Sequence, residues 1–143
     1  MVKVAKFGGS SVAGAEQFQK VKAIVEADPA RKVVVVSAAG KRSSGDHKLT
    51  DLLYLCHAHL TYGVSCDDIV HTIEQRLCEI RDELGLPFDV GAEMAKLEQS
   101  LSKDMSADEL VSRGEYLTSR LMADYLGYQF VDAADCVFFT YDG

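Results

Sequence analysis

The segment Lys6-Phe7-Gly8-Gly9-Ser10 holds the residue types that bind phosphate groups. Adjacent glycines let backbone N–H groups approach an anion closely, and a serine hydroxyl adds a further donor. An ammonium group two residues earlier could offset charge on a transferring phosphoryl group. The segment matches neither G-x-G-x-x-G nor a Walker P-loop. It therefore predicts either a phosphate-binding loop of another kind or a tight strand-to-helix turn beside a surface lysine.

A second polar segment runs from Ser37 to Thr50 and Asp51 and follows a run of four valines. Its hydroxyl groups, together with the first turn of a helix near Thr50, could bind a carboxylate or a phosphate. Thr50 is equally suited to be an ordinary helix N-cap, and the residues alone favour this second interpretation.

The third candidate is Ser112-Arg113-Gly114-Glu115, inside a helical pattern. A glycine within a helix costs about 1 kcal/mol relative to alanine, so Gly114 predicts that another part of the chain packs closely against the backbone there. Glu115 has no cation three or four residues away that would pair with it on the helix surface. It is either a plain solvated glutamate or a group that accepts a hydrogen bond from a substrate amine.

The elements that must position these residues follow an α/β order. Four consecutive valines at 33–36 favour a strand buried on both faces, as in a parallel sheet covered by helices. We expect strands at 2–7, 33–36, 128–132 and 136–139, and helices at 14–27, 50–61, 65–84, 87–103 and 106–127. This order predicts a three-layer α/β fold with a mainly parallel sheet, whose ligands gather beyond the carboxyl ends of the strands.

Composition limits the possible functions. A chain of 143 residues with 48% hydrophobic residues is long enough for a single domain. Its formal charge of −7 argues against nucleic-acid binding and against attraction to an anionic membrane. No apolar run is long enough to span a bilayer, and no export signal is visible, so we expect a cytoplasmic protein. The cysteines and histidines show no metal-ligand spacing, and no metal site is predicted.

Taken together, four segments resemble the aspartate kinase family in both order and spacing. They are Lys6-Phe7-Gly8-Gly9-Ser10-Ser11-Val12, Val33-Val34-Val35-Val36-Ser37-Ala38, Thr50-Asp51-Leu52-Leu53 and Val111-Ser112-Arg113-Gly114-Glu115. The first looks like the family's K-[FY]-G-G-[ST]-S-[VL] signature and the last like its S-x-G-E element. The similarity extends over essentially all 143 residues.

This resemblance implies the N-terminal portion of an amino acid kinase fold over residues 1–143, with ATP and Mg²⁺ as cofactors. It implies transfer of the ATP γ-phosphoryl group to the side-chain carboxylate of L-aspartate, the first step toward lysine, threonine and methionine, by a homo-oligomer. By analogy, Lys6 is the catalytic residue that stabilises the phosphoryl group. The phosphates are bound by Lys6, Phe7, Gly8, Gly9 and Ser10. Thr50 and Glu115 match aspartate-binding positions, with Ser37 and Arg113 as weaker matches.

Family members continue into a second half of the kinase domain and into regulatory ACT domains, neither of which is found in these 143 residues. We therefore expect the isolated chain to be inactive. Two alternatives stay open at this stage. One is another amino acid kinase, acting on glutamate, acetylglutamate or carbamate. The other is a non-catalytic, truncated module that self-associates through an unfinished sheet.

Overall fold

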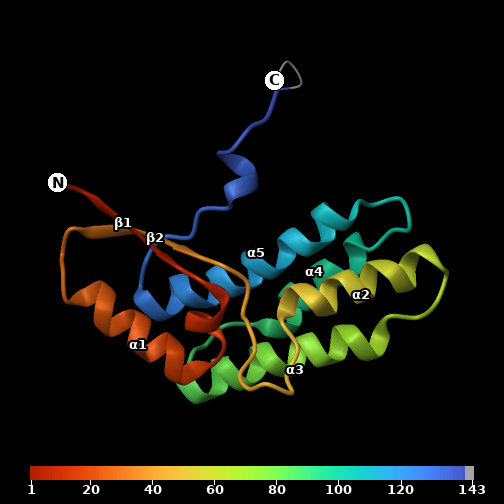
Figure 1. The fold of residues 1–143 in the computed structure, drawn as a ribbon, viewed down its shortest axis with the longest axis horizontal. Coiled ribbons are helices and arrows are strands. Elements are labelled where there is room, and N and C mark those ends of the chain that lie inside the picture. Colours follow the sequence, from red (N-terminus) through yellow and green to blue (C-terminus); the bar gives the residue numbers. More distant parts are fainter. Residues whose placement is uncertain (141–143) are drawn as a thin grey trace.

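The chain begins with a β-α-β unit in the computed structural model, which describes residues 1–140 (Figure 1). Strands β1 (Lys3–Phe7) and β2 (Arg31–Val36) pair in parallel. A short 3-10 turn, η1 (Gly9–Val12), and helix α1 (Ala15–Glu26) connect them. Parallel strands need such a crossover because the chain must return to the starting edge of the sheet. The sequence-based expectation for this unit is confirmed.

Four α-helices follow β2 and account for most of the remaining chain. They are α2 (Leu49–Thr61), α3 (Asp67–Leu84), α4 (Val90–Ser100) and α5 (Ala107–Leu126). Gly85 and Gly127 end α3 and α5 in the left-handed conformation, with φ of 66° and 71°. Ser106 caps α5, because its side chain accepts a hydrogen bond from the Glu109 N–H. None of the helices within residues 1–140 is long and apolar enough to cross a membrane.

Helix α4 is shorter at both ends than the predicted span of 87–103. Asp89 accepts a hydrogen bond from the Ala92 N–H, and this cap starts the helix after Pro87. At the other end Leu101 is extended, with ψ of 126°, although its side chain still packs against the core.

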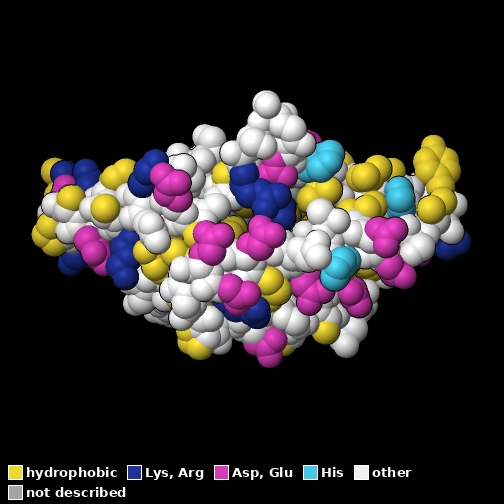
Figure 2. Space-filling model, turned by 90° about the horizontal axis from the view of Figure 1, so that it is seen from below, with side chains coloured by type: hydrophobic (Ala, Val, Ile, Leu, Met, Phe, Trp, Pro, Cys, Tyr) yellow, Lys and Arg dark blue, Asp and Glu magenta, His cyan; other side chains and the backbone are white. Residues whose placement is uncertain are grey.

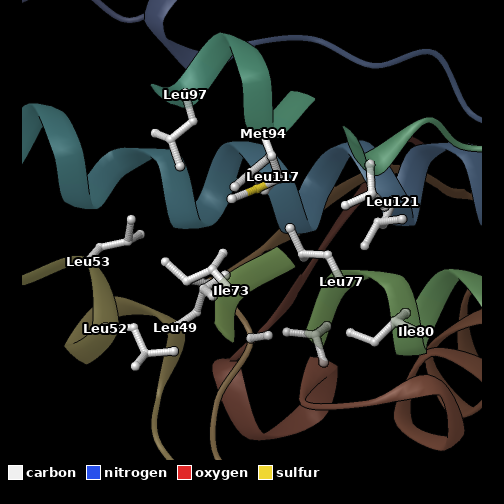
Figure 3. Close-up of a cluster of buried hydrophobic side chains, with 14 of the residues drawn as sticks. Leu49, Leu52, Leu53, Ile73, Leu77, Ile80, Met94, Leu97, Leu117 and Leu121 are labelled. Atoms are coloured by element: carbon white, nitrogen blue, oxygen red, sulfur yellow. The ribbon is translucent and has the colours of Figure 1, made fainter. Parts of the chain in front are cut away.

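The core lies between α5 and the other helices rather than around the sheet. Figure 3 shows leucine, isoleucine and methionine side chains from four helices converging on one another. The labelled residues are Leu49, Leu52, Leu53, Ile73, Leu77, Ile80, Met94, Leu97, Leu117 and Leu121. Each is at most 6% exposed, so the helices stay fixed by apolar burial of the kind their three- and four-residue spacing predicts.

The sheet has one covered face and one open face within the described residues. Val36 is buried, whereas Val4, Val33 and Val35 are 66%, 45% and 46% exposed. These three side chains share a face because Val4 lies opposite Val33 in the parallel register and side chains alternate along a strand. The prediction that β2 is buried on both faces is therefore wrong for residues 1–140, where helices pack on only one face.

The two short strands predicted after Gly127 do not form. Residues 128–132 and 136–140 have no regular secondary structure, and a 3-10 turn, η2 (Ala133–Asp135), separates them. The Tyr128 hydroxyl donates to the Arg31 carbonyl at 3.0 Å, but residues 128–131 do not pair with β2 and instead line, with it, a pocket of about 600 Å³. A β-branched or aromatic run becomes a strand only when its backbone finds a partner, and this one has none within the described residues.

Candidate functional site

The carboxyl ends of the two strands bring the first two candidate segments together. The Ser37 N–H donates to the Phe7 carbonyl at 3.0 Å, and the Gly40 N–H donates to the Gly9 carbonyl at 2.9 Å. The glycine-rich loop and the loop after β2 are therefore joined edge to edge. This is the edge where open α/β sheets bind ligands.

Two glycines make this junction possible. A Cβ atom on Gly9 would lie 2.9 Å from the Ala38 carbonyl oxygen, and one on Gly40 would lie 2.8 Å from the Gly9 carbonyl carbon. Both contacts involve backbone atoms, which have little room to move. Gly9 and Gly40 are thus required by the packing of one loop against the other, whether or not a ligand is bound.

Gly8 has no such internal requirement. Its φ of −73° and ψ of 172° suit any residue, and a Cβ atom there would meet nothing within 4 Å. The backbone N–H groups of Gly9 and Ser10 donate no hydrogen bond within residues 1–140. An open space next to free donors has the shape and chemistry of a cradle for an anion.

Lys6 stands just before this cradle, and its side chain is exposed. It forms no hydrogen bond or ion pair with any described residue, so its charge is available to a ligand. Phe7, in contrast, is half-buried and packs against the hydrophobic core, which fixes the end of β1.

The start of α2 lies at the same edge. The Leu49 N–H donates to the Ala39 carbonyl at 2.9 Å and ties the helix to the loop after β2. Lys48 is the N-cap of α2, and Thr50 lies inside the first turn with its side chain half-buried. The interpretation of Thr50 as an ordinary N-cap is therefore wrong. Its hydroxyl makes no hydrogen bond within the described residues.

Helix α5 completes the edge through Gly114. A Cβ atom on Gly114 would lie 2.9 Å from the Ala38 Cβ and 3.1 Å from the Leu53 Cδ1, which confirms the predicted close packing. One turn later, the Thr118 hydroxyl accepts a hydrogen bond from the Ala39 N–H at 3.2 Å. These contacts hold the turn that carries Glu115 against the end of β2. Glu115 itself is exposed and has no ion-pair partner among the described residues.

Arg113 and Glu115 line a pocket of about 460 Å³ with Val35 of β2. The guanidinium of Arg113 lies 3.9 Å from the Asp132 carboxylate and 4.9 Å from the centre of the Tyr116 ring. Arg113 is thus turned toward the segment after α5. Lys6, Ser37 and Thr50 do not line this pocket, so the predicted residues share one edge of the fold without sharing one cavity.

The sequence model of the amino acid kinase family matches residues 1–143. The chain belongs to the amino acid kinase family. Aspartokinase 3 of Bacillus subtilis is 36% identical to it, and the match covers 92% of this chain and 30% of that protein. The crystal structure of Clostridium acetobutylicum aspartate kinase is 44% identical with a TM-score of 0.85, and the match covers 90% of this chain and 30% of that one.

Two complexes of E. coli aspartokinase III are more distant. The complex with aspartate and ADP is 24% identical with a TM-score of 0.68, covering 89% of this chain and 29% of that one. The complex with lysine and aspartate is 25% identical with a TM-score of 0.67, covering 90% and 30%. The chain thus has the amino acid kinase-like fold and spans about a third of the length of the relatives it matches.

Sequence reasoning missed one residue that packs at the carboxyl ends of the two strands, Arg76 on α3. It is 4% exposed and donates hydrogen bonds to backbone carbonyls of the two loops. The sequence signal was available, because Arg76 follows Ile73 by three residues and precedes Ile80 by four, on the apolar stripe of the helix. A charged residue on a buried helix face needs dedicated partners. The apolar spacing of the segment, taken alone, indicates only a packing surface.

Acidic and basic side chains lie near one another on the surface of this chain. Figure 2 shows Lys and Arg side chains interleaved with Asp and Glu over the face that it presents. In the loop after β2, the Arg42 guanidinium donates to Asp46 at 2.7 Å and holds the pKa of that carboxyl well below its usual range. Residues 1–140 contain no group of three or more His, Cys, Asp or Glu side chains that could hold a metal ion.

Proposed function

We propose that this chain is the N-terminal portion of the catalytic domain of an aspartate kinase. The enzyme would transfer the ATP γ-phosphoryl group to the side-chain carboxylate of L-aspartate and yield 4-phospho-L-aspartate. The observation that carries the proposal is the meeting of the glycine-rich loop, the loop after β2, the start of α2 and the Gly114 turn at one edge of the sheet. The aspartokinases of B. subtilis and C. acetobutylicum, at 36% and 44% identity, support the choice of aspartate.

ATP phosphates would be bound at the end of β1 by Lys6, Phe7, Gly8, Gly9 and Ser10. The backbone N–H groups of Gly9 and Ser10 lack acceptors within the described residues, and Gly8 leaves room for a phosphate oxygen. The Lys6 ammonium would offset the negative charge that develops on the transferring group. In phosphoryl transfer the protein takes little part in covalent bond making or breaking. These residues would therefore contribute by positioning the reactants and by compensating charge.

L-aspartate would be bound beside the phosphates by Thr50 and Glu115, with Ser37 and Arg113 lining the site. The Glu115 carboxylate has no partner among the described residues and is suited to accept hydrogen bonds from the substrate amine. The Thr50 hydroxyl and the first turn of α2 are suited to a substrate carboxylate, because helix N-termini attract anions.

Mg²⁺ belongs to the proposal together with ATP, and it would supply further charge neutralisation at the phosphates. We assign it no ligand within residues 1–140, which hold no cluster of metal-binding side chains. E. coli aspartokinase III has been crystallised with aspartate and ADP, which supports a nucleotide and an amino acid as joint ligands. We extend the proposal to a cytoplasmic homo-oligomer.

The decisive experiment uses the full-length enzyme that contains this chain. Aspartate-dependent ADP release is expected, with glutamate, acetylglutamate and carbamate as alternative acceptors in the same assay. Turnover of glutamate without turnover of aspartate would replace our choice of substrate. We expect the isolated chain of 143 residues to show no aspartate-dependent ADP release.

Two substitutions separate the proposed roles. Lys6→Ala is expected to lower kcat, because the charge matters most in the transition state, whereas Glu115→Ala is expected chiefly to raise the KM for aspartate. Glu109→Ala removes the same side chain from an exposed position in the first turn of α5 and serves as the matched control. An unchanged aspartate KM in Glu115→Ala would remove Glu115 from the substrate site.

A further inference from the structure

A single buried guanidinium links three backbone segments around the proposed site. One terminal nitrogen of Arg76, Nη2, donates to the Gly40 carbonyl at 2.7 Å and to the Ala13 carbonyl at 3.1 Å. The other, Nη1, donates to the His47 carbonyl at 2.8 Å. All three acceptors are backbone oxygens from outside α3. The guanidinium therefore holds other segments of the chain in place and makes no hydrogen bond to its own helix.

Each acceptor marks a boundary of the proposed site. Ala13 directly follows η1, at the far end of the glycine-rich loop. Gly40 belongs to the loop after β2 and donates its own N–H to Gly9. His47 lies two residues before α2, whose first turn carries Thr50. Through one planar group, Arg76 sets the glycine-rich loop, the loop after β2 and the start of α2 relative to one another.

Arginine is the residue type that this geometry requires. The guanidinium is a rigid planar fork, so its two terminal nitrogens point in fixed directions toward separate acceptors. A lysine would retain the charge but offers only one nitrogen on a flexible stem. Arg76 is 4% exposed, and within residues 1–140 the one carboxylate that forms an ion pair with it is Asp46, at 3.9 Å. A charge this deeply buried is retained only where its hydrogen bonds compensate for the lost hydration.

A surface network anchors the same loop from outside. Arg42 donates to Asp46 at 2.7 Å and to Glu79 of α3 at 2.7 Å. Glu79 follows Arg76 by three residues, so the Arg42–Glu79 and Arg76–His47 contacts both connect one face of α3 to the loop of residues 41–47, which the Arg42–Asp46 pair braces internally. Ser10, Arg42 and Arg76 line one pocket of about 240 Å³, which places this network next to the glycine-rich loop.

We propose that Arg76 is a positioning residue of the kinase site, which holds the nucleotide-binding loop and the substrate-binding helix start in register without touching either ligand. The inference rests on the proposed function. It predicts that loss of Arg76 weakens binding of both ATP and aspartate, because the two binding segments depend on the same guanidinium. If Arg76 only stabilised the fold, its loss would lower the stability of the enzyme and the fraction of active molecules. The KM values would not change, because KM does not depend on the concentration of active enzyme.

The test compares Arg76→Met, Arg76→Lys and Arg81→Met in the full-length enzyme. Arg81 is the matched control on the same helix, since it bonds to Asp82 and to the Phe88 carbonyl and not to the loops. We expect the KM values for ATP and for aspartate to rise about tenfold in Arg76→Met, as suits the loss of charge-assisted hydrogen bonds. Arg76→Lys should lie between wild type and Arg76→Met, and Arg81→Met should keep both KM values.

Amide hydrogen exchange provides a second readout that does not require activity. The Gly40 and Leu49 amides donate to Gly9 and Ala39, so they should exchange faster in both Arg76 variants and not in Arg81→Met. Lower stability or kcat with unchanged KM values and unchanged exchange would overturn the proposal. If Arg76→Met does not fold, Arg76→Lys decides by the same two criteria. A wild-type enzyme without aspartate turnover would refute the proposed function alone, and the exchange measurement would still judge Arg76.

Discussion

Substituting the two adjacent glycines of the first loop separates what the fold needs from what a ligand needs. Gly8→Ala adds a methyl group to an open space, whereas Gly9→Ala places one 2.9 Å from the Ala38 carbonyl oxygen and 3.4 Å from the Gly40 nitrogen. The two substitutions are chemically identical and one residue apart. We expect Gly9→Ala to lower the stability of the chain and Gly8→Ala not to lower it.

The magnitudes follow from the geometry. Replacing glycine by alanine in a conformation that alanine tolerates stabilises a protein by about 0.4–1 kcal/mol, because the unfolded chain loses freedom. Gly8, with φ of −73°, meets that condition. Forcing a methyl group into a packed site costs about 1–3 kcal/mol. Gly9→Ala should therefore lower the free energy of unfolding by about 1–2 kcal/mol, while Gly8→Ala should leave it unchanged or slightly higher.

We expect Gly8→Ala to impair ATP binding although it does not lower the stability of the chain. In the full-length enzyme, Gly8→Ala should raise the KM for ATP, because the methyl group occupies the space proposed for a phosphate oxygen. Stability is measured by urea unfolding of the 143-residue chain, with circular dichroism as the signal. The KM for ATP is measured at saturating aspartate, with Gly45→Ala as control, since a Cβ atom on Gly45 also meets nothing within 4 Å.

Two results would refute the reasoning. A Gly9→Ala chain as stable as wild type would show that the two loops do not approach as closely as their backbone contacts indicate. An unchanged KM for ATP in Gly8→Ala, together with unchanged stability, would show that the open space at Gly8 does not face a phosphate.

Three further predictions concern other parts of the chain. Gly114→Ala should raise the KM for aspartate and lower the unfolding free energy by up to about 2 kcal/mol, since overpacking against Ala38 exceeds the helix-propensity gain of about 1 kcal/mol; kinetics and urea unfolding check this. The depressed pKa of Asp46 beside Arg42 adds stability that is present above about pH 4 and is lost as pH falls further. In urea unfolding from about pH 3 to 7, the free energy of unfolding of wild type should exceed that of Asp46→Asn, and the difference should shrink only at the acid end. Burial and a neighbouring thiol raise the pKa of Cys56 to about 12, so mass spectrometry should find it unalkylated by iodoacetamide at pH 8 until the chain unfolds.

Local patterns predict the helices well because their signals lie within one or two turns. The Ser106 cap with Gly127 as terminator defines α5, and apolar spacing with Gly85 defines α3. The interior glycine at 114 correctly indicates a close contact, although it cannot name Ala38 as the partner. Such a contact joins residues far apart in sequence, which no local pattern encodes.

Predictions that depend on distant partners fare worse. The valine run at 33–36 predicts burial on both faces, yet Val33 and Val35 are exposed because helices cover one face only within residues 1–140. The strand-like run at 128–132 stays irregular for want of a hydrogen-bonded neighbour among the same residues. Thr50 has the residue type of a cap but lies in the first turn, because the helix begins one residue earlier, at Leu49. The Leu49 N–H bonds to the Ala39 carbonyl in the loop after β2, a contact that no local pattern encodes.

The sequence by itself determined the β-α-β start, the positions of the helices and the family, because periodicity, caps and the Lys6-to-Ser10 motif are local or directly comparable features. Tertiary structure alone decided which glycines serve the fold and which leave open space, since that depends on what lies opposite each one. It also decided the part played by Arg76. A guanidinium on an apolar helix face acquires its three acceptors only when two loops and a helix start fold around it.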